Sequence, residues 1–196
     1  FAYDNYASDP KVWLVLLRVP SVWRILVPAS ESQSDQFLLS DEYKEQVFDR
    51  LIGIPDTKTE HRTIYRVHQR VAKKFNHGRV FLVGDSAHLN NPLGGFGMNS
   101  GIHDAWNLCE KLLTCLDKGH QDKLLDLFDL QRRTVTYNFI QAQTKQNKAL
   151  LEHGKSEGHE QRLSQMREFS TDPVKRRDFL LRQAMFTSLQ DARNIT

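Results

Sequence analysis

Cysteine is scarce in this 196-residue chain, which contains only Cys109 and Cys115. The two lie six residues apart in a stretch with helical periodicity, so their side chains point to different faces of one helix. A disulfide between them is therefore not expected, and the spacing is not that of a zinc site. We expect two reduced thiols packed in or near a core, as is typical of a cytoplasmic protein.

Long hydrophobic runs and blocks of one charge sign are absent as well. No apolar run approaches the roughly 20 residues that a helix needs to cross a bilayer. The 27 Lys and Arg residues are mixed with 24 Asp and Glu residues, for a net charge of +3, so no basic block indicates binding to nucleic acid or to a membrane. The composition, with 39% hydrophobic and 26% charged residues, is that of an ordinary soluble protein.

The chain begins with Phe1 rather than Met, and no signal peptide precedes it. The opening residues Phe1-Ala2-Tyr3-Asp4 resemble the interior of a sequence. We therefore expect the chain to be a piece of a longer protein, with room for one domain or one and a half.

The first part of the chain has the patterns of strands. Residues 12–17 and 22–27 are apolar runs joined by Val19-Pro20-Ser21, which is typical of a β-hairpin. Residues 29–36 are polar and predict a loop, and the helix that follows is capped by Ser40 and ended by Gly53 and Pro55. A long strand over 59–71, a turn at 76–78 and a buried strand over 80–83 are expected next.

The second part has the patterns of helices. Six side chains spaced 4, 3, 4, 3 and 4 residues apart share one face of a helix: Met98, Ile102, Ala105, Cys109, Leu112 and Leu116. A second helix is expected over 121–151, a linker over 153–160 and a third helical stretch around 163–169. Asp172-Pro173 then predicts a capped helix start. The fold class is therefore α/β, in the form of an α+β fragment.

A glycine-rich loop lies between the last predicted strand and the first long helix. Four of the ten glycines fall between Gly94 and Gly101. Glycines allow a backbone to approach a ligand closely, and a helix N-terminus offers unpaired N–H groups and partial positive charge. Asp85 follows the strand, so its carboxylate is expected at the strand's C-terminal edge, where it can accept hydrogen bonds from hydroxyl groups. The two features suit a ligand with a hydroxylated chain and an anionic or carbonyl edge.

Two familiar glycine motifs do not fit this loop. The dinucleotide motif G-x-G-x-x-G would need a glycine where Ser100 stands, and the loop lies too far from the strand. The nucleophile elbow G-x-S-x-G fails at His88, although a Gly-Asp-Ser hydrolase with Ser86 as nucleophile stays open. A capped turn with a purely architectural role also stays open.

Three segments together resemble the FAD-dependent aromatic-ring monooxygenases of the para-hydroxybenzoate hydroxylase type. They are Gly78 to His88 (GRVFLVGDSAH), Pro92 to Asn99 (PLGGFGMN) and Asp104 to Leu108 (DAWNL). The similarity covers about residues 10 to 150. Two further stretches, Tyr65 to Ala72 and the strands around Trp23, resemble neighbouring parts of the same enzymes.

The resemblance implies that NAD(P)H reduces FAD and that O2 then supplies one oxygen atom to an aromatic, phenol-like substrate. Asp85 would bind the ribityl hydroxyls, Pro92 and Gly94 would line the flavin ring, and the N–H groups of Met98 and Asn99 would face its pyrimidine edge. The implied cofactor-binding residues are Gly84, Asp85, Pro92, Gly94, Gly95, Gly97, Met98 and Asn99. No residue is assigned a catalytic role, and no metal is expected.

The family's ADP-binding strand–loop–helix has no counterpart in this sequence, so an N-terminal half or a partner chain would have to supply it. The resemblance implies a two-domain Rossmann-like parent. Of this parent, residues 1–58 would be the end of the substrate-binding sheet domain, 59–118 the C-terminal part of the FAD-binding domain, and 119–196 a helical region. The alternative is a non-catalytic flavin-fold module that serves as an interaction subunit. The oligomeric state is open, with a homodimer among the alternatives.

Other conspicuous side chains are expected to be structural. His88 is predicted to make a structural hydrogen bond, because no metal ligands accompany it. Trp13, Trp23 and Trp106 are expected in the core rather than in a substrate cage.

Overall fold

The computed structural model describes residues 2–8, 13–30, 32–54, 56–119, 121–152 and 157–196. The chain divides into two compact units. The first comprises Phe1–Arg66 with Leu151–Gly154, and the second comprises Val67–Leu150 with Lys155–Thr196.

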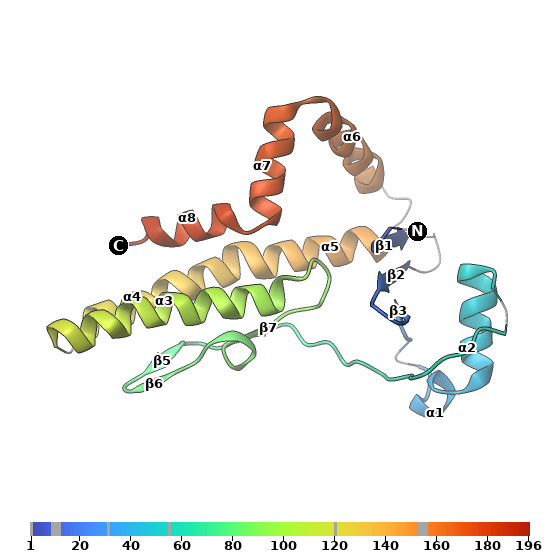
Figure 1. Cartoon of the computed structure of the whole chain (residues 1–196), viewed down its shortest axis with the longest axis horizontal. Coiled ribbons are helices and arrows are strands. Elements are labelled where there is room, and N and C mark those ends of the chain that lie inside the picture. Colours follow the sequence, from blue (N-terminus) through green and yellow to red (C-terminus); the bar gives the residue numbers. More distant parts are fainter. Residues whose placement is uncertain (1, 9–12, 31, 55, 120, 153–156) are drawn as a thin grey trace. The chain divides into compact units, whose positions relative to one another are not determined.

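A three-stranded antiparallel sheet opens the first unit (Figure 1). Its strands, in spatial order, are β1 (Asp4–Ser8), β2 (Trp13–Arg18) and β3 (Trp23–Leu26). The central strand β2 buries Leu14, Val15 and Leu16. The predicted hairpin is confirmed as β2–β3, with Val12 lying outside the described residues, whereas β1 was not predicted.

Three short helical segments complete the first unit: α1 (Asp35–Leu38), α2 (Asp41–Val47) and the π-helical η1 (Phe48–Ile52). The predicted cap is confirmed, because the Ser40 side chain accepts a hydrogen bond from the Tyr43 N–H at 3.1 Å. Gly53 ends the helix in the left-handed region with φ of 68°. The predicted loop over 29–36 is wrong at its end, since Ser34 caps α1 and the helix begins at Asp35.

The long strand predicted over 59–71 is wrong. Only β4 (Arg70–Val71) is regular, and it pairs with β7 (His88–Leu89). Residues rich in Thr, Ile, Tyr and Val form strands where a neighbouring strand and a buried face exist. Among the described residues no strand pairs with 59–69, and Tyr65 and Val67 are exposed.

The strand predicted over 80–83 is shorter and less buried than expected. β6 (Val80–Phe81) forms a small hairpin with β5 (Asn76–His77), turning through Gly78 at φ of 57°. The turn predicted over 76–78 is confirmed only at Gly78, because Asn76 and His77 form β5 and the turn occupies residues 78 and 79. Val80 is 63% exposed, so the prediction of a buried strand is wrong.

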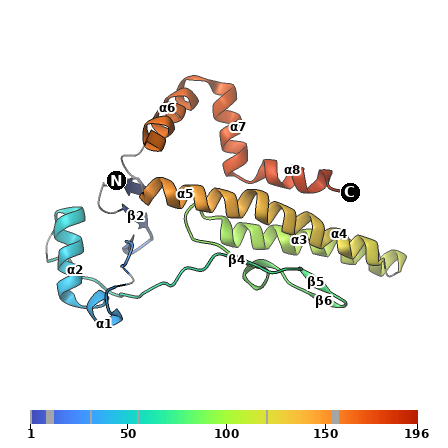
Figure 2. The same cartoon turned by 180° about the vertical axis from the view of Figure 1, so that it is seen from behind.

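Helices dominate the second unit. Its first long helix, α3 (Phe96–Lys118), lies beside the next, α4 (Asp122–Val135) (Figures 1 and 2). The π-helical η3 (Thr136–Gln141) then continues α4 into α5 (Ala142–Glu152). The remaining helices are α6 (Glu157–Thr171), α7 (Pro173–Gln183) and α8 (Phe186–Asn194). No helix in the described part of the chain is long and apolar enough to cross a membrane.

The predicted helix boundaries of this unit are partly confirmed. Asp172 caps α7 by accepting from the N–H groups of Val174 and Lys175. The helix that starts there ends at Gln183, and Met185, in the left-handed conformation, separates α7 from α8. Of the predicted linker 153–160, residues 153–156 lie outside the described residues, and 157–160 are helical, so the prediction is wrong there.

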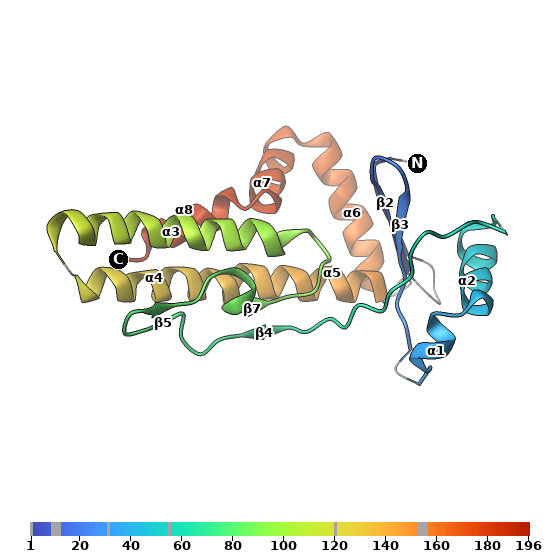
Figure 3. The ribbon, with the colours of Figure 1, turned by 60° about the horizontal axis from the view of Figure 1, so that its bottom comes forward.

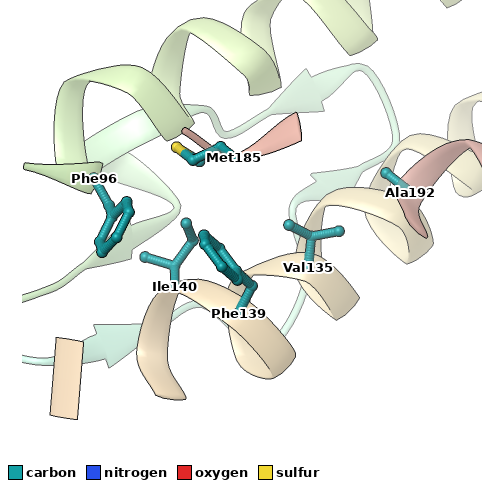
Figure 4. Packing of buried hydrophobic residues seen from close by; sticks show 6 residues of the cluster. All are labelled: Phe96, Val135, Phe139, Ile140, Met185 and Ala192. Carbon is teal, nitrogen blue, oxygen red and sulfur yellow. The ribbon is translucent and has the colours of Figure 1, made fainter. Parts of the chain in front are cut away.

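The main hydrophobic core of the second unit lies where the start of α3, η3 and α8 meet. Its buried members are Phe96, Val135, Phe139, Ile140, Met185 and Ala192 (Figure 4). The rings of Phe96 and Phe139 meet edge to face, with centroids 5.4 Å apart. A smaller cluster of Phe75, Ala87 and Phe128 joins α4 to the region of the β5–β6 hairpin. Figure 3 shows β5 beside α4.

Beyond Phe96, which belongs to the main core, the face that α3 buries is polar. Ser100, Asp104 and Lys111 are buried, whereas Met98 is 75% exposed and Leu116 is 83% exposed. The predicted apolar face therefore exists but is turned away from the core of this unit. The expected burial of Cys109 is wrong for the same reason, and so is that of Trp106. Trp23, which is 41% exposed on β3, is also outside the core.

We predict that Phe139→Ala lowers the free energy of unfolding by about 3–5 kcal/mol, the cost of emptying a packed aromatic site. Chemical denaturation followed by circular dichroism measures this loss. Tyr137→Ala is the matched control, because Tyr137 is half exposed and an exposed site changes stability by less than about 0.5 kcal/mol. Equal losses in the two variants would contradict the assigned core.

Candidate flavin site

A single turn of 3-10 helix, η2 (Gly84–Ser86), follows β6 and carries Asp85. The Ser86 hydroxyl donates to the Val83 carbonyl at 2.8 Å and accepts from the Val83 N–H at 3.1 Å. Gly84 has φ of 57°, a conformation that suits glycine. The Asp85 side chain is left exposed. In the described part of the chain it has no hydrogen-bonded or charged partner, so it is free to accept from a ligand.

The turn lies directly against α3. A Cβ added at Gly101 would come within 3.1 Å of the Gly84 Cα, so a larger residue at 101 would push the turn away. Gly101 was noted in the sequence only as part of a glycine-rich stretch. Its role is to allow this contact between the turn and the helix.

A buried carboxylate fastens the turn to two helices. Asp104 of α3 has no exposed surface, and its Oδ2 accepts from the Gly84 N–H at 3.0 Å and from His88 Nε2 at 2.7 Å. Its Oδ1 accepts from Arg132 Nε of α4 at 2.6 Å. The structural role predicted for His88 is confirmed by this contact. Sequence reasoning did not assign a role to Asp104 or Arg132.

The charge of Asp104 is maintained by its partners. Burial by itself would raise the pKa of this carboxyl, but the hydrogen bond from His88 and the charge and hydrogen bond of Arg132 outweigh it and hold the pKa below its usual range. His103, one residue earlier, has a pKa lowered by burial and by the nearby Arg132. The site is therefore built around an ionised carboxylate that faces a fixed cation.

The loop before α3 is shaped by glycine and held by α5. Gly94 has φ of 109°, and a Cβ there would lie 2.5 Å from the Phe96 ring and 2.7 Å from Asn147 Nδ2. Asn147 donates to the Leu93 carbonyl at 3.2 Å, and Asn91 Oδ1 accepts from the Leu93 N–H at 3.1 Å. Position 94 therefore requires glycine. The hydrogen bonds from Asn147 and to Asn91 hold the loop backbone at Leu93.

The first turn of α3 presents free N–H groups beside this loop. Gly95, with φ of 69°, is the N-cap, and its own N–H donates to the Pro92 carbonyl at 3.0 Å. A helix that begins at Phe96 leaves the N–H groups of Phe96, Gly97 and Met98 without partners in the helix. The Asn99 N–H has the Gly95 carbonyl as its regular helical partner, and the Asn99 side chain donates to that same carbonyl at 3.0 Å. The Met98 N–H is therefore better placed than the Asn99 N–H to donate to a ligand.

The structure places the predicted residues on the turn η2, in the loop before α3 and in the first turn of α3, all within the second unit. Asp85 stands on the turn η2, while Pro92, Gly94 and Gly95 form the loop and Gly97, Met98 and Asn99 lie in the first turn of α3. Pro92, Met98 and Asn99 are exposed, as contact with a ligand requires. The arrangement offers a hydroxyl acceptor on one side and N–H donors with a positive helix end on the other.

Neither hydrolase nor metal chemistry gains support from this geometry. The Ser86 hydroxyl donates its hydrogen to the Val83 carbonyl within the turn. The Nε2 of the nearby His88 is hydrogen-bonded to Asp104 rather than to Ser86. Among the described residues no group of three His, Cys, Asp or Glu side chains is placed to hold a metal ion.

Comparison with protein families decides what kind of chain carries this site. A family model described as "FAD binding domain" matches residues 18–162, which include the turn, the loop and the Asp104 contacts. Para-nitrophenol 4-monooxygenase of Pseudomonas sp. strain WBC-3 is 32% identical, over 92% of this chain. The chain belongs to the family of FAD-dependent aromatic hydroxylases.

Further members of this hydroxylase family agree in sequence or in structure. The 6-hydroxy-3-succinoylpyridine 3-monooxygenase HspB of Pseudomonas putida is 36% identical over 59% of this chain and 30% of its own length. The crystal structure of p-nitrophenol 4-monooxygenase PnpA from Pseudomonas putida DLL-E4 superposes with a TM-score of 0.68 and 28% identity, over 100% of this chain and 46% of that one. Para-nitrophenol 4-monooxygenase is likewise covered over 46% of its length, so the chain spans about half of such a relative.

We predict that Asp104→Asn costs about 3–5 kcal/mol of stability at neutral pH, because it leaves the buried Arg132 cation without its counter-charge. The folded-state pKa of Asp104 is depressed, so its contribution is complete above the unfolded pKa of about 4 and is lost as the pH falls through the folded value. The stability difference between the two proteins should therefore shrink as the pH falls below about 4.

Denaturation at a series of pH values measures this difference. Asp85→Asn is the control, because the Asp85 carboxylate is exposed and its loss should change stability by less than about 0.5 kcal/mol. A difference between the wild type and Asp104→Asn that stays constant down to a pH of about 2 would contradict the assigned ion pair.

Proposed function

We propose that the chain is part of an FAD-dependent monooxygenase that hydroxylates a phenol-like aromatic substrate with NAD(P)H and O2. The observation that carries this proposal is the exposed Asp85 on a turn fastened to the helix whose free N-terminus follows the glycine loop. The names of relatives, among them para-nitrophenol 4-monooxygenase, support an aromatic substrate.

The residues present fit the flavin half of FAD. Asp85 would accept from hydroxyl groups of the ribityl chain, and Pro92 and Gly94 would line the ring. The Met98 N–H and the positive end of α3 would stabilise negative charge at the pyrimidine edge. Gly84, Gly95, Gly97 and Asn99 shape this site through their backbone. FAD, when bound, supplies the redox chemistry, and the protein orients it and tunes its electrostatics.

The ADP half of FAD needs a segment that this sequence does not contain. The unused face of α3 supports the proposal that such a segment packs there. Met98, Ile102 and Leu116 of the predicted apolar face are exposed, and so are the neighbouring Trp106 and Leu113. An apolar stripe of this kind is normally buried. We assign it to an N-terminal half of the same chain, because the relatives are about twice as long as this sequence.

This half would complete a two-domain, Rossmann-like parent. Residues 1–58 would then belong to its substrate domain, 59–118 to its FAD-binding domain and 119–196 to its helical C-terminal region. A non-catalytic module would keep the fold but would not retain FAD, which the first experiment below tests.

We predict that Asp85→Ala in the full-length protein weakens FAD binding roughly tenfold to a hundredfold, the contribution of a charge-assisted hydrogen bond. Quenching of flavin fluorescence on binding measures the dissociation constant. Asp117→Asn, an exposed carboxylate at the far end of α3, should leave it unchanged. Unchanged affinity in Asp85→Ala, or no flavin bound by the wild type, would sink the assignment.

We predict that Ile102→Glu destabilises the full-length protein but has little effect on the stability of the 196-residue chain by itself. In the 196-residue chain Ile102 is exposed, so the change should alter stability by less than about 0.5 kcal/mol. In the full-length protein the same change should cost at least about 2 kcal/mol, because a charge would enter a buried apolar contact. Thermal unfolding of both proteins measures this, and a negligible cost in the full-length protein would remove the proposed docking face.

A further inference from the structure

The contacts of Asp104 point to a role beyond stability. Its Oδ2 atom binds the N–H of Gly84, the residue directly before Asp85. A backbone N–H held by a buried ionised carboxylate has little freedom to turn. The plane of the Val83–Gly84 peptide, at the start of the turn that carries Asp85, therefore has a fixed orientation relative to α3.

The same carboxylate is itself immobile. His88 Nε2 and Arg132 Nε hold its two oxygens from β7 and from α4, at 2.7 and 2.6 Å. The side chains of His88 and Arg132 are both buried. The position of the Gly84 peptide is thus set by two helices and not by the short turn alone.

We propose that Asp104, held by Arg132, is a positioning residue for the flavin-binding carboxylate Asp85. This inference rests on the proposed function, since it assumes that Asp85 binds FAD. Asp104 is buried and acts through its hydrogen bond to the Gly84 N–H. This bond holds the Val83–Gly84 peptide, and with it the start of the turn from which the Asp85 side chain projects.

An amide cannot replace the carboxylate here. If the amide oxygen introduced by Asp104→Asn faced Gly84 and His88, its NH2 group would oppose the Arg132 donor. If that oxygen faced Arg132, the NH2 group would oppose the Gly84 N–H. One contact is lost in either orientation, because Asp104 accepts from donors on both oxygens.

The test uses the double variant Asp104→Leu/Arg132→Met in the full-length holoenzyme, which leaves no side-chain acceptor for the Gly84 N–H. Changing both partners to apolar residues avoids leaving a buried charge unpaired, so the protein keeps its fold more readily than with Asp104 changed alone. The matched control is Asp129→Leu/Arg133→Met. Asp129 is a buried carboxylate that also accepts a backbone N–H, that of Phe75 at 2.7 Å, and pairs with an arginine, but it does not contact the turn.

We expect the Asp104/Arg132 variant to bind FAD about tenfold more weakly, the effect of misdirecting one charge-assisted hydrogen bond. The control pair should leave the affinity unchanged. In an Asp85→Ala background the Asp104/Arg132 change should weaken binding by less than about twofold, because the side chain it positions is already absent. A full tenfold loss in that background would overturn the proposal and show a general structural effect.

Hydrogen exchange gives a readout that does not depend on FAD affinity. The Gly84 amide should exchange slowly in the wild type and faster in the Asp104/Arg132 variant, with no change in the control. Rapid exchange in the wild type would overturn the inference without any variant. If Asp85→Ala alone leaves FAD affinity unchanged, the proposed function fails; if only the Asp104/Arg132 variant has no effect, this inference fails alone.

Discussion

The buried carboxylate of Asp104 is the constraint on which the site depends. It joins the turn after β6 to α3 and, through Arg132, to α4. Such an ion pair is costly to bury, since two charges leave water, and further hydrogen bonds offset part of this cost. His88 and the Gly84 N–H provide such bonds to the carboxylate, whereas Arg132 Nη2 has no hydrogen-bond partner in the described part of the chain. A change at any one of these four residues therefore affects all three elements.

This constraint also explains why α3 is oriented as it is. The side chains it buries against α4 are polar and include Asp104 and Lys111, with Lys111 donating to Gln131 at 2.9 Å. Such a contact is specific in geometry but adds little hydrophobic stabilisation. The opposite, apolar face of α3 keeps its capacity to bury surface for another segment, so the helix can bind two neighbours by different physical means.

How much the sequence predicted depends on the range of the interactions involved. The caps at Ser40 and Asp172 and the β2–β3 hairpin were predictable, because they depend on residues close in the chain. The strand over 59–71 was not, because strand propensity has no effect without a partner strand. The Asp85 turn and glycine loop were recognisable from their motifs. Asp104 was seen only as part of a motif, since its partners lie 20 and 28 residues away and no local pattern pairs them.

The arrangement favours binding without rearrangement. Asp85 stands on a turn that touches α3 at Gly101 and is held by Asp104, while the free N–H groups belong to the first turn of that same helix. The Asp85 acceptor and the N–H donors are thus positioned by the same helix, α3. A ligand that spans both does not have to bring two mobile parts together, and the entropy cost of doing so is absent on binding. If the proposed flavin binds here, the same rigidity would hold its ring in one orientation.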